Sequence, residues 1–216
     1  MLEKISYYAA TLAETGLALF GIRGLFEQPS HTIRQDLGHG LEIRDYAPAA
    51  AVETTGTGAT RDKASEDAFR RLFGYITGAN TGAQTLAMTV PVQRTSLLIA
   101  MTTPVRMDPE ATDTAGQSQV TMRFFVPAKH AGNPPVPTDP KVRLVTIPAT
   151  TAAVLRFSGN PTEQARAEKE RDLLTRLGAS RWHPTGTPYL QGYDPPFAIP
   201  FLKRNEIAVE VSGATR

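Results

Sequence analysis

Alternating apolar and polar positions predict three strands in the first third of the chain. Residues 31–34 and 41–46 each alternate, and glycines between them favour a reversal, so the two segments are typical of a β-hairpin. Pro48 interrupts the pattern because it cannot donate a ladder hydrogen bond. Residues 50–55 resume the alternation and indicate a third strand, which ends in a glycine-rich turn.

The period of the apolar positions changes after this strand. From Asp62 onward they recur at intervals of three and four residues, as on one side of a helix, and Gly78 or Asn80 is expected to end it. The apolar stripe consists of Ala64, Ala68, Phe69, Leu72, Phe73 and Ile76. The sequence therefore predicts an amphipathic helix with a broad, aromatic-rich face.

The same order of elements recurs about one hundred residues later. Residues 142–147 alternate, a proline interrupts them, and residues 152–157 indicate another strand. A helix follows, with Asn160 as the expected N-cap and Pro161 at its first position, and it ends at Gly178. This repeated pattern predicts a single α+β domain in which two pseudo-repeated halves share one sheet and each carries a packed helix.

The remaining segments complete the predicted sheet. Residues 120–126 and 205–211 alternate as strands, and residues 97–101 form a shorter apolar run. Residues 108–118 are polar and rich in turn formers, as in a hairpin loop. Residues 130–140 are rich in proline, which predicts an extended connection between the halves without ladder hydrogen bonds.

Two nearly identical hexapeptides, AMTVPV at residues 87–92 and AMTTPV at residues 100–105, end in the same Thr-x-Pro-Val pattern. Proline removes a backbone donor, so strand pairing must stop or bulge there. If residues 93–96 are a short link, the two strand ends lie close together and bring Met88 and Met101 to one place. There the methionines either fill the core or contact a flat ligand, since methionine is flexible and polarisable.

Composition and charge exclude several classes of protein. The 216 residues include 23 Lys and Arg against 21 Asp and Glu, without a long basic run, so we expect no nucleic-acid partner. The chain has no cysteine, which excludes disulfides, thiolate-bound zinc and covalently attached c-type haem, and which fits a cytoplasmic location.

The N-terminal apolar run at residues 16–22 is too short to span a membrane, so we expect no transmembrane segment. Residues 1–28 are instead predicted to form a helical extension that docks on a partner or a membrane surface.

Catalytic and metal-binding motifs give little support to chemistry. The sequence contains no G-x-S-x-G, H-E-x-x-H, Walker loop or G-x-G-x-x-G motif. No two of the four histidines have the helical spacing of a preformed metal pair. His39, in the predicted hairpin turn, is the candidate metal ligand, and a solvated turn histidine is the alternative interpretation.

Several longer segments match a family pattern in its order along the chain. They are LEIRDYAP at residues 41–48, AFRRLFGYITGAN at 68–80, the two hexapeptides, MRFFVP at 122–127, PPVPTDPKV at 134–142 and GYDPPFAIPFLKRNEIAVEV at 192–211. Together they resemble the SOUL haem-binding protein family, from about Pro29 to the end of the chain. The resemblance implies a haem-binding domain at residues 29–216, folded as a distorted antiparallel β-barrel of two pseudo-repeated halves, each with a packed α-helix.

The resemblance also implies a ligand and a way of holding it. Haem, b-type and non-covalent, or protoporphyrin is expected in an apolar pocket beside the first helix of the barrel. In one branch of the family a histidine that follows the Arg of the E-x-R-x-Y strand has been taken as an iron ligand. This chain has Asp45 there, so it is similar to the branch that holds haem by apolar contact, unless His39 substitutes.

The candidate site lies on the first helix and the hexapeptides. Apolar side chains are expected to form the pocket wall, and the two arginines beside them to meet propionates by charge-assisted hydrogen bonds. The predicted contacts are Phe69, Arg70, Leu72, Phe73, Ile76, Met88 and Met101, with Arg71 as a second candidate for the propionates.

Three classes of function stay open on this basis. The favoured one is a non-catalytic carrier, buffer or sensor of a tetrapyrrole. The second is a hydrolase of a tetrapyrrole or other hydrophobic ester, in which Glu206 or Asp194 acts with Tyr193 or Tyr46 and burial raises the pKa of the carboxyl. The third is an interaction protein with a vestigial pocket, and assembly into a homo-oligomer is compatible with each class.

Overall fold

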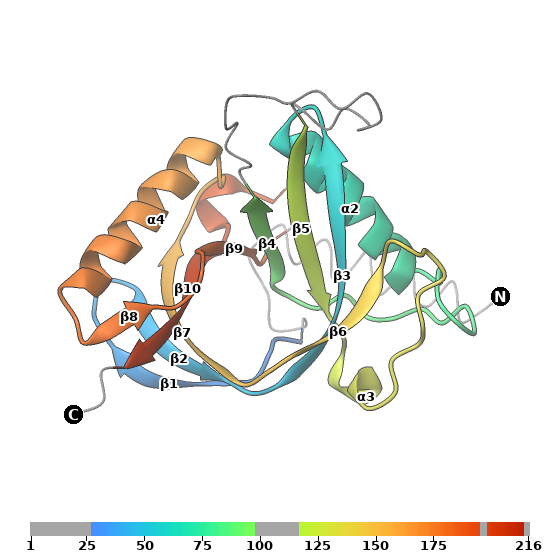
Figure 1. Ribbon diagram of the computed structural model, residues 1–216, viewed down its shortest axis with the longest axis horizontal. Coiled ribbons are helices and arrows are strands. Elements are labelled where there is room, and N and C mark those ends of the chain that lie inside the picture. Colours follow the sequence, from blue (N-terminus) through green and yellow to red (C-terminus); the bar gives the residue numbers. More distant parts are fainter. Residues whose placement is uncertain (1–26, 98–116, 195–197, 214–216) are drawn as a thin grey trace, which may run out of the picture.

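The computed structural model describes residues 27–97, 117–194 and 198–213. Within them, one curved antiparallel sheet carries two long helices (Figure 1). The strands are β1 (His31–Asp36), β2 (Leu41–Tyr46), β3 (Ala49–Gly58), β4 (Val92–Leu97), β5 (Ser118–Phe125), β6 (Arg143–Ile147), β7 (Thr150–Phe157), β8 (Trp182–Pro184), β9 (Tyr189–Gly192) and β10 (Asn205–Gly213). The helical elements are α2 (Arg61–Ile76), α3 (Ala128–Ala131), α4 (Glu163–Gly178) and the 3-10 helix η1 (Pro200–Leu202).

The order of strands confirms the two pseudo-repeated halves. The first half is β2-β3-α2-β4-β5 and the second is β6-β7-α4-β9-β10, with β1 and β8 as additions. In the sheet the order is β1-β2-β7-β10-β9-β4-β5-β3-β6, so the arrangement from β2 inward matches the arrangement from β6 inward. The sheet curves strongly without closing, as Figure 1 shows, which confirms the predicted distorted barrel in an α+β fold.

The halves are joined by an exchange of strands. β2 pairs with β7, where Tyr46 lies opposite Thr150, and β3 pairs with β6, where Ala49 lies opposite Ile147. Each half therefore supplies an edge to the other. The proline in each predicted strand pair stands at the turn between β2 and β3 or between β6 and β7, where no ladder donor is needed.

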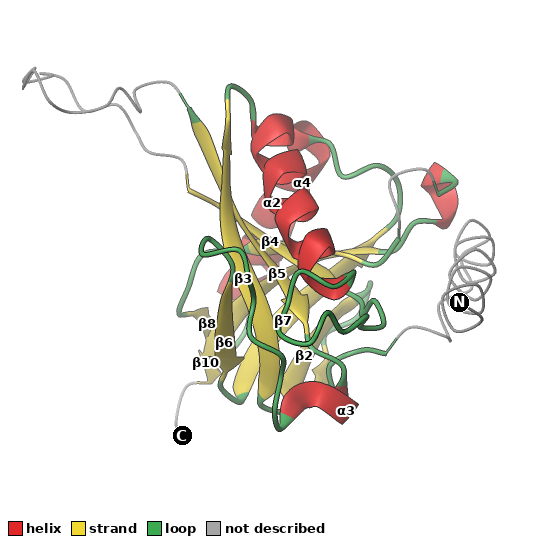
Figure 2. Cartoon of the chain, turned by 90° about the vertical axis from the view of Figure 1, so that its right-hand side faces the viewer, coloured by secondary structure: helices red, strands yellow, loops and turns green. Residues whose placement is uncertain are grey.

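Each long helix covers one half of the sheet. α2 packs on β3 and β5, and α4 packs on β7, β8 and β10; the side view in Figure 2 shows both helices together, with α3 at the far end of the strands. Gly56 permits the close approach of α2, since a Cβ there would lie 2.1 Å from the carbonyl oxygen of Ala64. Thr60 caps α2 by accepting a hydrogen bond from the Lys63 amide at 3.3 Å.

Two hydrophobic clusters lie between the sheet and the helices. The cluster under α4 contains Leu41, Ile43, Ala153, Leu155, Leu173, Leu177, Trp182, Leu190, Ile207, Val209 and Val211. The cluster under α2 contains Val52, Ala68, Leu72, Tyr75, Ile76, Leu86, Met122, Phe124 and Val142. The predicted periodicity of α2 is thus confirmed, because Ala64, Ala68, Leu72 and Ile76 of its apolar stripe are buried. Phe73 of the same stripe is exposed.

The start of α4 corrects one prediction. The helix begins at Glu163, and its N-cap is Thr162, whose hydroxyl accepts a hydrogen bond from the Ala165 amide at 3.2 Å. Asn160, the predicted cap, instead accepts a hydrogen bond from Lys203 Nζ at 2.8 Å. The physical reason is that Pro161 does not occupy the first helical position, so the cap moves to the next residue with a suitable side chain.

Two connections also differ from the predicted ones. Residues 93–96 were expected to link the hexapeptides, but they lie inside β4, because the proline of AMTVPV precedes this strand and does not end it. The proline-rich stretch at 130–140 begins within the short helix α3. β8 and β9 were not predicted. The second hexapeptide, almost all of the predicted loop at 108–118, and residues 1–26 of the predicted N-terminal extension lie outside the described residues.

Candidate functional site

Two aromatic side chains of α2, Phe69 and Phe73, form a row that reaches the surface. Phe69 and Phe73 stack with ring centroids 5.8 Å apart and planes 15° apart. Phe69 also meets the edge of Phe124 on β5, with centroids 5.5 Å apart. Phe73 is 45% exposed. We call Phe69 and Phe73 the aromatic face of α2, and it offers a flat apolar surface to solvent.

The other apolar positions predicted for the pocket wall lie deeper. Leu72 is fully buried and Ile76 is 5% exposed, and both belong to the cluster under α2. Met88 is half-buried and packs against the same cluster. Phe69 of the aromatic face packs against this cluster as well. Met101 lies outside the described residues.

The two arginines beside the aromatic face are held by an acidic residue. Asp67 accepts a hydrogen bond from Arg70 at 2.7 Å and two from Arg71 at 3.2 Å, and Arg71 also reaches Asp139 at 3.3 Å. Burial opposes ionisation of Asp67, but the arginines prevail and lower the pKa of its carboxyl. A polar surface hollow of about 390 Å³ lies over these side chains, so the hollow on α2 is lined by charge rather than by apolar groups.

His39 lies apart from α2. It sits exposed in the turn between β1 and β2, with φ 48°. Its carbonyl accepts a hydrogen bond from Arg176 of α4 at 3.3 Å, so the turn is attached to the other helix. The structure thus brings Phe69, Phe73 and the two arginines together on α2 but does not bring His39 to them. In the described ranges, no three His, Asp or Glu side chains gather as a metal site.

The residues named for a hydrolase form a buried ionic network instead. Glu206 is fully buried, and its carboxylate accepts hydrogen bonds from Arg44 at 3.0 and 3.2 Å and from Arg204 at 2.6 and 3.0 Å. Tyr193 donates its hydroxyl to the same carboxylate at 2.6 Å. Asp194 accepts a hydrogen bond from the Arg204 amide at 2.6 Å.

The electrostatics of this network oppose acid-base catalysis. Burial alone would raise the pKa of Glu206, but Arg44 and Arg204 outweigh it and lower that pKa. A general acid would need the opposite shift. The network also joins the E-x-R-x-Y segment to the segment around Glu206, because Arg44 of the first binds the carboxylate of the second.

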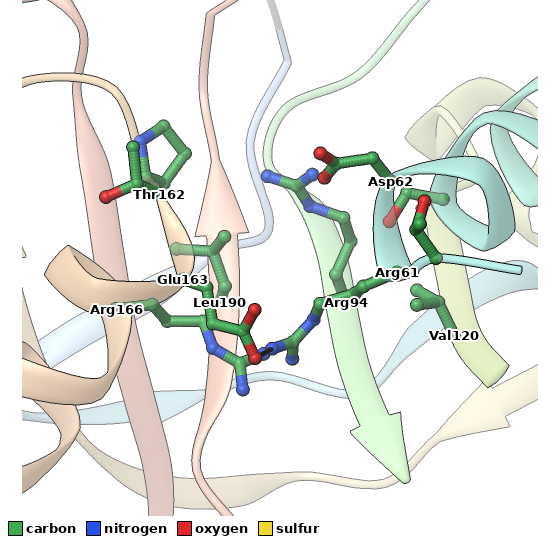
Figure 3. A pocket seen from close by; sticks show the side chains of 11 residues that line it. Arg61, Asp62, Arg94, Val120, Thr162, Glu163, Arg166 and Leu190 are labelled. Carbon is green, nitrogen blue, oxygen red and sulfur yellow. Dashed lines mark ion pairs between the residues drawn. The ribbon is translucent and has the colours of Figure 1, made fainter. Parts of the chain in front are cut away.

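A second cavity, which the sequence did not indicate, lies between the first turns of α2 and α4 (Figure 3). Its volume is about 260 Å³. We call it the inter-helix cleft, and its walls include Arg61, Asp62, Arg94, Glu163, Arg166 and Leu190. Arg94 on β4 was the residue of the sequence that could have indicated this cleft. It lies between a buried and a half-buried position, but the pattern of apolar residues does not distinguish it from a strand residue that faces solvent.

The fold, in which two α+β halves share one curved sheet and each carries a helix, is similar to the crystal structure of the EcmrR C-terminal domain. The TM-score is 0.54 at 14% identity, covering 81% of this chain and 98% of that one, which is a likeness of fold alone.

The chain belongs to the SOUL heme-binding protein family, whose model matches residues 26–210. It is 29% identical over 170 residues to heme-binding protein 1 of Xenopus tropicalis, covering 79% of this chain and 83% of that protein. It is 27% identical over 183 residues to heme-binding protein 2 of Mus musculus, covering 83% and 82%. Among the helices of the described ranges, none has the length and apolar character needed to span a membrane.

Proposed function

We propose that this protein binds haem or a related tetrapyrrole, without chemistry of its own, on the aromatic face of α2. The observation that carries the proposal is the stacked pair of Phe69 and Phe73, with Phe73 45% exposed. Membership of the SOUL heme-binding protein family and relatives named heme-binding protein support the ligand class. A cytoplasmic carrier, buffer or sensor is the role that we propose for such a protein.

The ring of the ligand would pack on the aromatic face. Offset stacking on an aromatic side chain contributes about 0.5–1.5 kcal/mol beyond the area that it buries. Phe69 packs against the cluster that contains Leu72 and Ile76, and Met88 packs against the same cluster. Met101 stays a predicted contact.

Charge near the face would orient the ligand. Arg70 follows Phe69 in the chain, and its side chain is 78% exposed while it binds Asp67. A propionate would share Arg70 with Asp67, so its contribution is expected to be small and sensitive to salt. His39 contacts α4 rather than α2, so we test it separately as a proposed iron ligand.

A titration with paired variants tests the proposal. Purified protein is titrated with haemin and with metal-free protoporphyrin IX, and the Soret absorbance is followed. We expect saturable one-to-one binding of both, with similar affinity, and about 2- to 10-fold weaker binding for Phe73→Ala. Leu174→Ala is the control, because it removes a similarly exposed apolar side chain, 40% exposed, from α4.

Three outcomes would contradict parts of this proposal. The absence of saturable binding to either compound would remove the function and favour a vestigial pocket. Equal losses for Phe73→Ala and Leu174→Ala would move the site away from the aromatic face. Binding of haemin but not of the metal-free ring, abolished by His39→Ala, would show that iron ligation and not stacking provides the affinity.

A further inference from the structure

Among the described residues that line the inter-helix cleft, Arg94 has a side-chain donor that is not used. Arg94 on β4 pairs with Leu190 on β9, so both side chains point to the same face of the sheet, under the starts of α2 and α4. In the part of the chain that the structure describes, the Nε atom of Arg94 is buried without a hydrogen-bond partner. A buried donor without an acceptor is costly, so Arg94 would gain from a ligand that supplies one.

The other arginines of the cleft are engaged by carboxylates. Arg61 lies 3.8 Å from Glu163 across the cleft, as the dashed line in Figure 3 marks. Arg166 lies 3.1 Å from Glu170 on the same helix. Each of these pairs is neutral in sum. In the described part of the chain, Arg94 is the arginine of the cleft for which no ion pair with a carboxylate is found. Leu190 makes one side of the wall apolar.

Charges of both signs surround Arg94, and the positive ones favour a negatively charged hydrogen-bond acceptor in the cleft. Burial lowers the pKa of the Arg94 guanidinium, Arg61 lowers it further by repulsion, and Asp62 opposes both. Figure 3 shows the guanidinium on the side of the cleft where Asp62 stands. Both 16-residue helices also begin at this cleft, with N-caps Thr60 and Thr162, and each helix start carries a positive partial charge of about half a unit.

We propose that the inter-helix cleft binds the oxyanion group, carboxylate or phosphate, of a small molecule, with Arg94 as its principal donor. A guanidinium offers such a group two parallel hydrogen bonds. The volume of about 260 Å³ suits a small anion, since cavities for larger ligands begin at about 300 Å³. Asp62 and the apolar wall restrict where the rest of the molecule lies.

This site is separate from the aromatic face of α2. Along the helix, Phe69 lies about 10 Å from Asp62 at a rise of about 1.5 Å per residue. The oxyanion could belong to a free metabolite or to a propionate of a tetrapyrrole that extends along α2. These two sources share the same chemistry, and the experiment separates them.

Calorimetric titration of the full chain with inorganic phosphate and with succinate, at low ionic strength, tests the site. We expect saturable binding of at least one of them in the millimolar range or tighter. Arg94→Met should weaken it about 10-fold or more, as the loss of a charge-assisted hydrogen bond predicts. Arg34→Gln is the control, because it removes an exposed arginine of β1 outside the cleft and should leave the affinity unchanged.

A second variant keeps the test decisive if Arg94→Met does not fold. Glu163 is 74% exposed, so Glu163→Gln should fold, and it removes the carboxylate that competes for Arg61. We expect it to tighten binding of the anion. Lack of saturable binding by the wild type, unchanged affinity in Arg94→Met, or unchanged or weaker binding in Glu163→Gln would each overturn the proposal.

The source of the oxyanion follows from a comparison of protoporphyrin IX with its dimethyl ester. If a propionate occupies the cleft, Arg94→Met weakens binding of the free acid and not of the ester. If a free anion is the ligand, Arg94→Met leaves both affinities unchanged while it still abolishes binding of phosphate or succinate.

Discussion

Replacement of Glu206 by glutamine should destabilise the protein strongly, although it only replaces one carboxylate oxygen by an amide NH2 group. The carboxylate is fully buried and balances Arg44, whose side chain is 5% exposed, and Arg204, whose side chain is 17% exposed. Glutamine removes the negative charge and turns amide hydrogens toward groups that are themselves donors. Arg44 keeps one carboxylate, because Glu42 accepts its Nε at 2.7 Å.

The size of the effect follows from the burial. Removing one partner of a buried ion pair costs about 3–5 kcal/mol, because the remaining charge stays desolvated. In a chain of this length, each kcal/mol lowers Tm by about 2–4 °C, so Glu206→Gln should lower it by about 6–20 °C. The retained contact between Arg44 and Glu42 places the expected value in the lower half of that range.

Thermal and urea denaturation, followed by circular dichroism, measure this change. Glu66→Gln is the matched control, because it is the same substitution on the exposed face of α2, where Glu66 pairs with Lys63, and it should leave Tm essentially unchanged. A loss below about 1 kcal/mol for Glu206→Gln, with an unchanged urea m-value, would refute the view that the network is a stabilising unit.

Three further predictions concern pH, packing and capping. The pKa of Glu206 is lowered in the folded protein, so its contribution to the free energy of unfolding is complete above the ordinary value of 4.5 and is lost as pH falls through the folded-state pKa. The free energy of unfolding should therefore decline less steeply in acid for Glu206→Gln than for wild type. Equal slopes of this free energy against pH would contradict the prediction. Gly56→Ala should lower the free energy of unfolding by about 2–3 kcal/mol, because the added Cβ forces α2 from the sheet. Gly132→Ala is the control and should lower it little, because Gly132 has open space around it. Equal effects of the two variants in urea titrations would contradict this prediction. Thr162→Ala should speed hydrogen exchange at the Ala165 amide and lower the free energy of unfolding by about 1 kcal/mol, because it removes the cap of α4. Thr162→Ser keeps the hydroxyl and should retain the protection. Unchanged exchange in Thr162→Ala would argue against this cap.

Much of the fold could be predicted because its signals are local. The change from a period of two to a period of 3.6 marked the start of α2, and the repeated order of elements indicated two halves. The pairing of β2 with β7 and of β3 with β6 could not be predicted, since these contacts join residues about one hundred positions apart. β8 and β9 could not be predicted because strands of three and four residues show too few alternations.

The candidate site was predicted less completely than the fold. Periodicity identifies one side of a helix, but it does not say how much of that side a sheet covers. Leu72 and Phe73 were therefore expected to act alike, whereas Leu72 is fully buried and Phe73 is 45% exposed. Arg94 could not be distinguished from a surface arginine, because its burial depends on α2 and α4, which meet over β4 only in three dimensions.

The exchange of strands between the halves has a consequence for synthesis on the ribosome. β3 can complete its pairing with β6, and β2 with β7, only after the later half has emerged. Until then the nascent chain exposes unpaired strand edges, which invite contacts with other chains. We therefore expect the first half to depend on chaperone protection during translation.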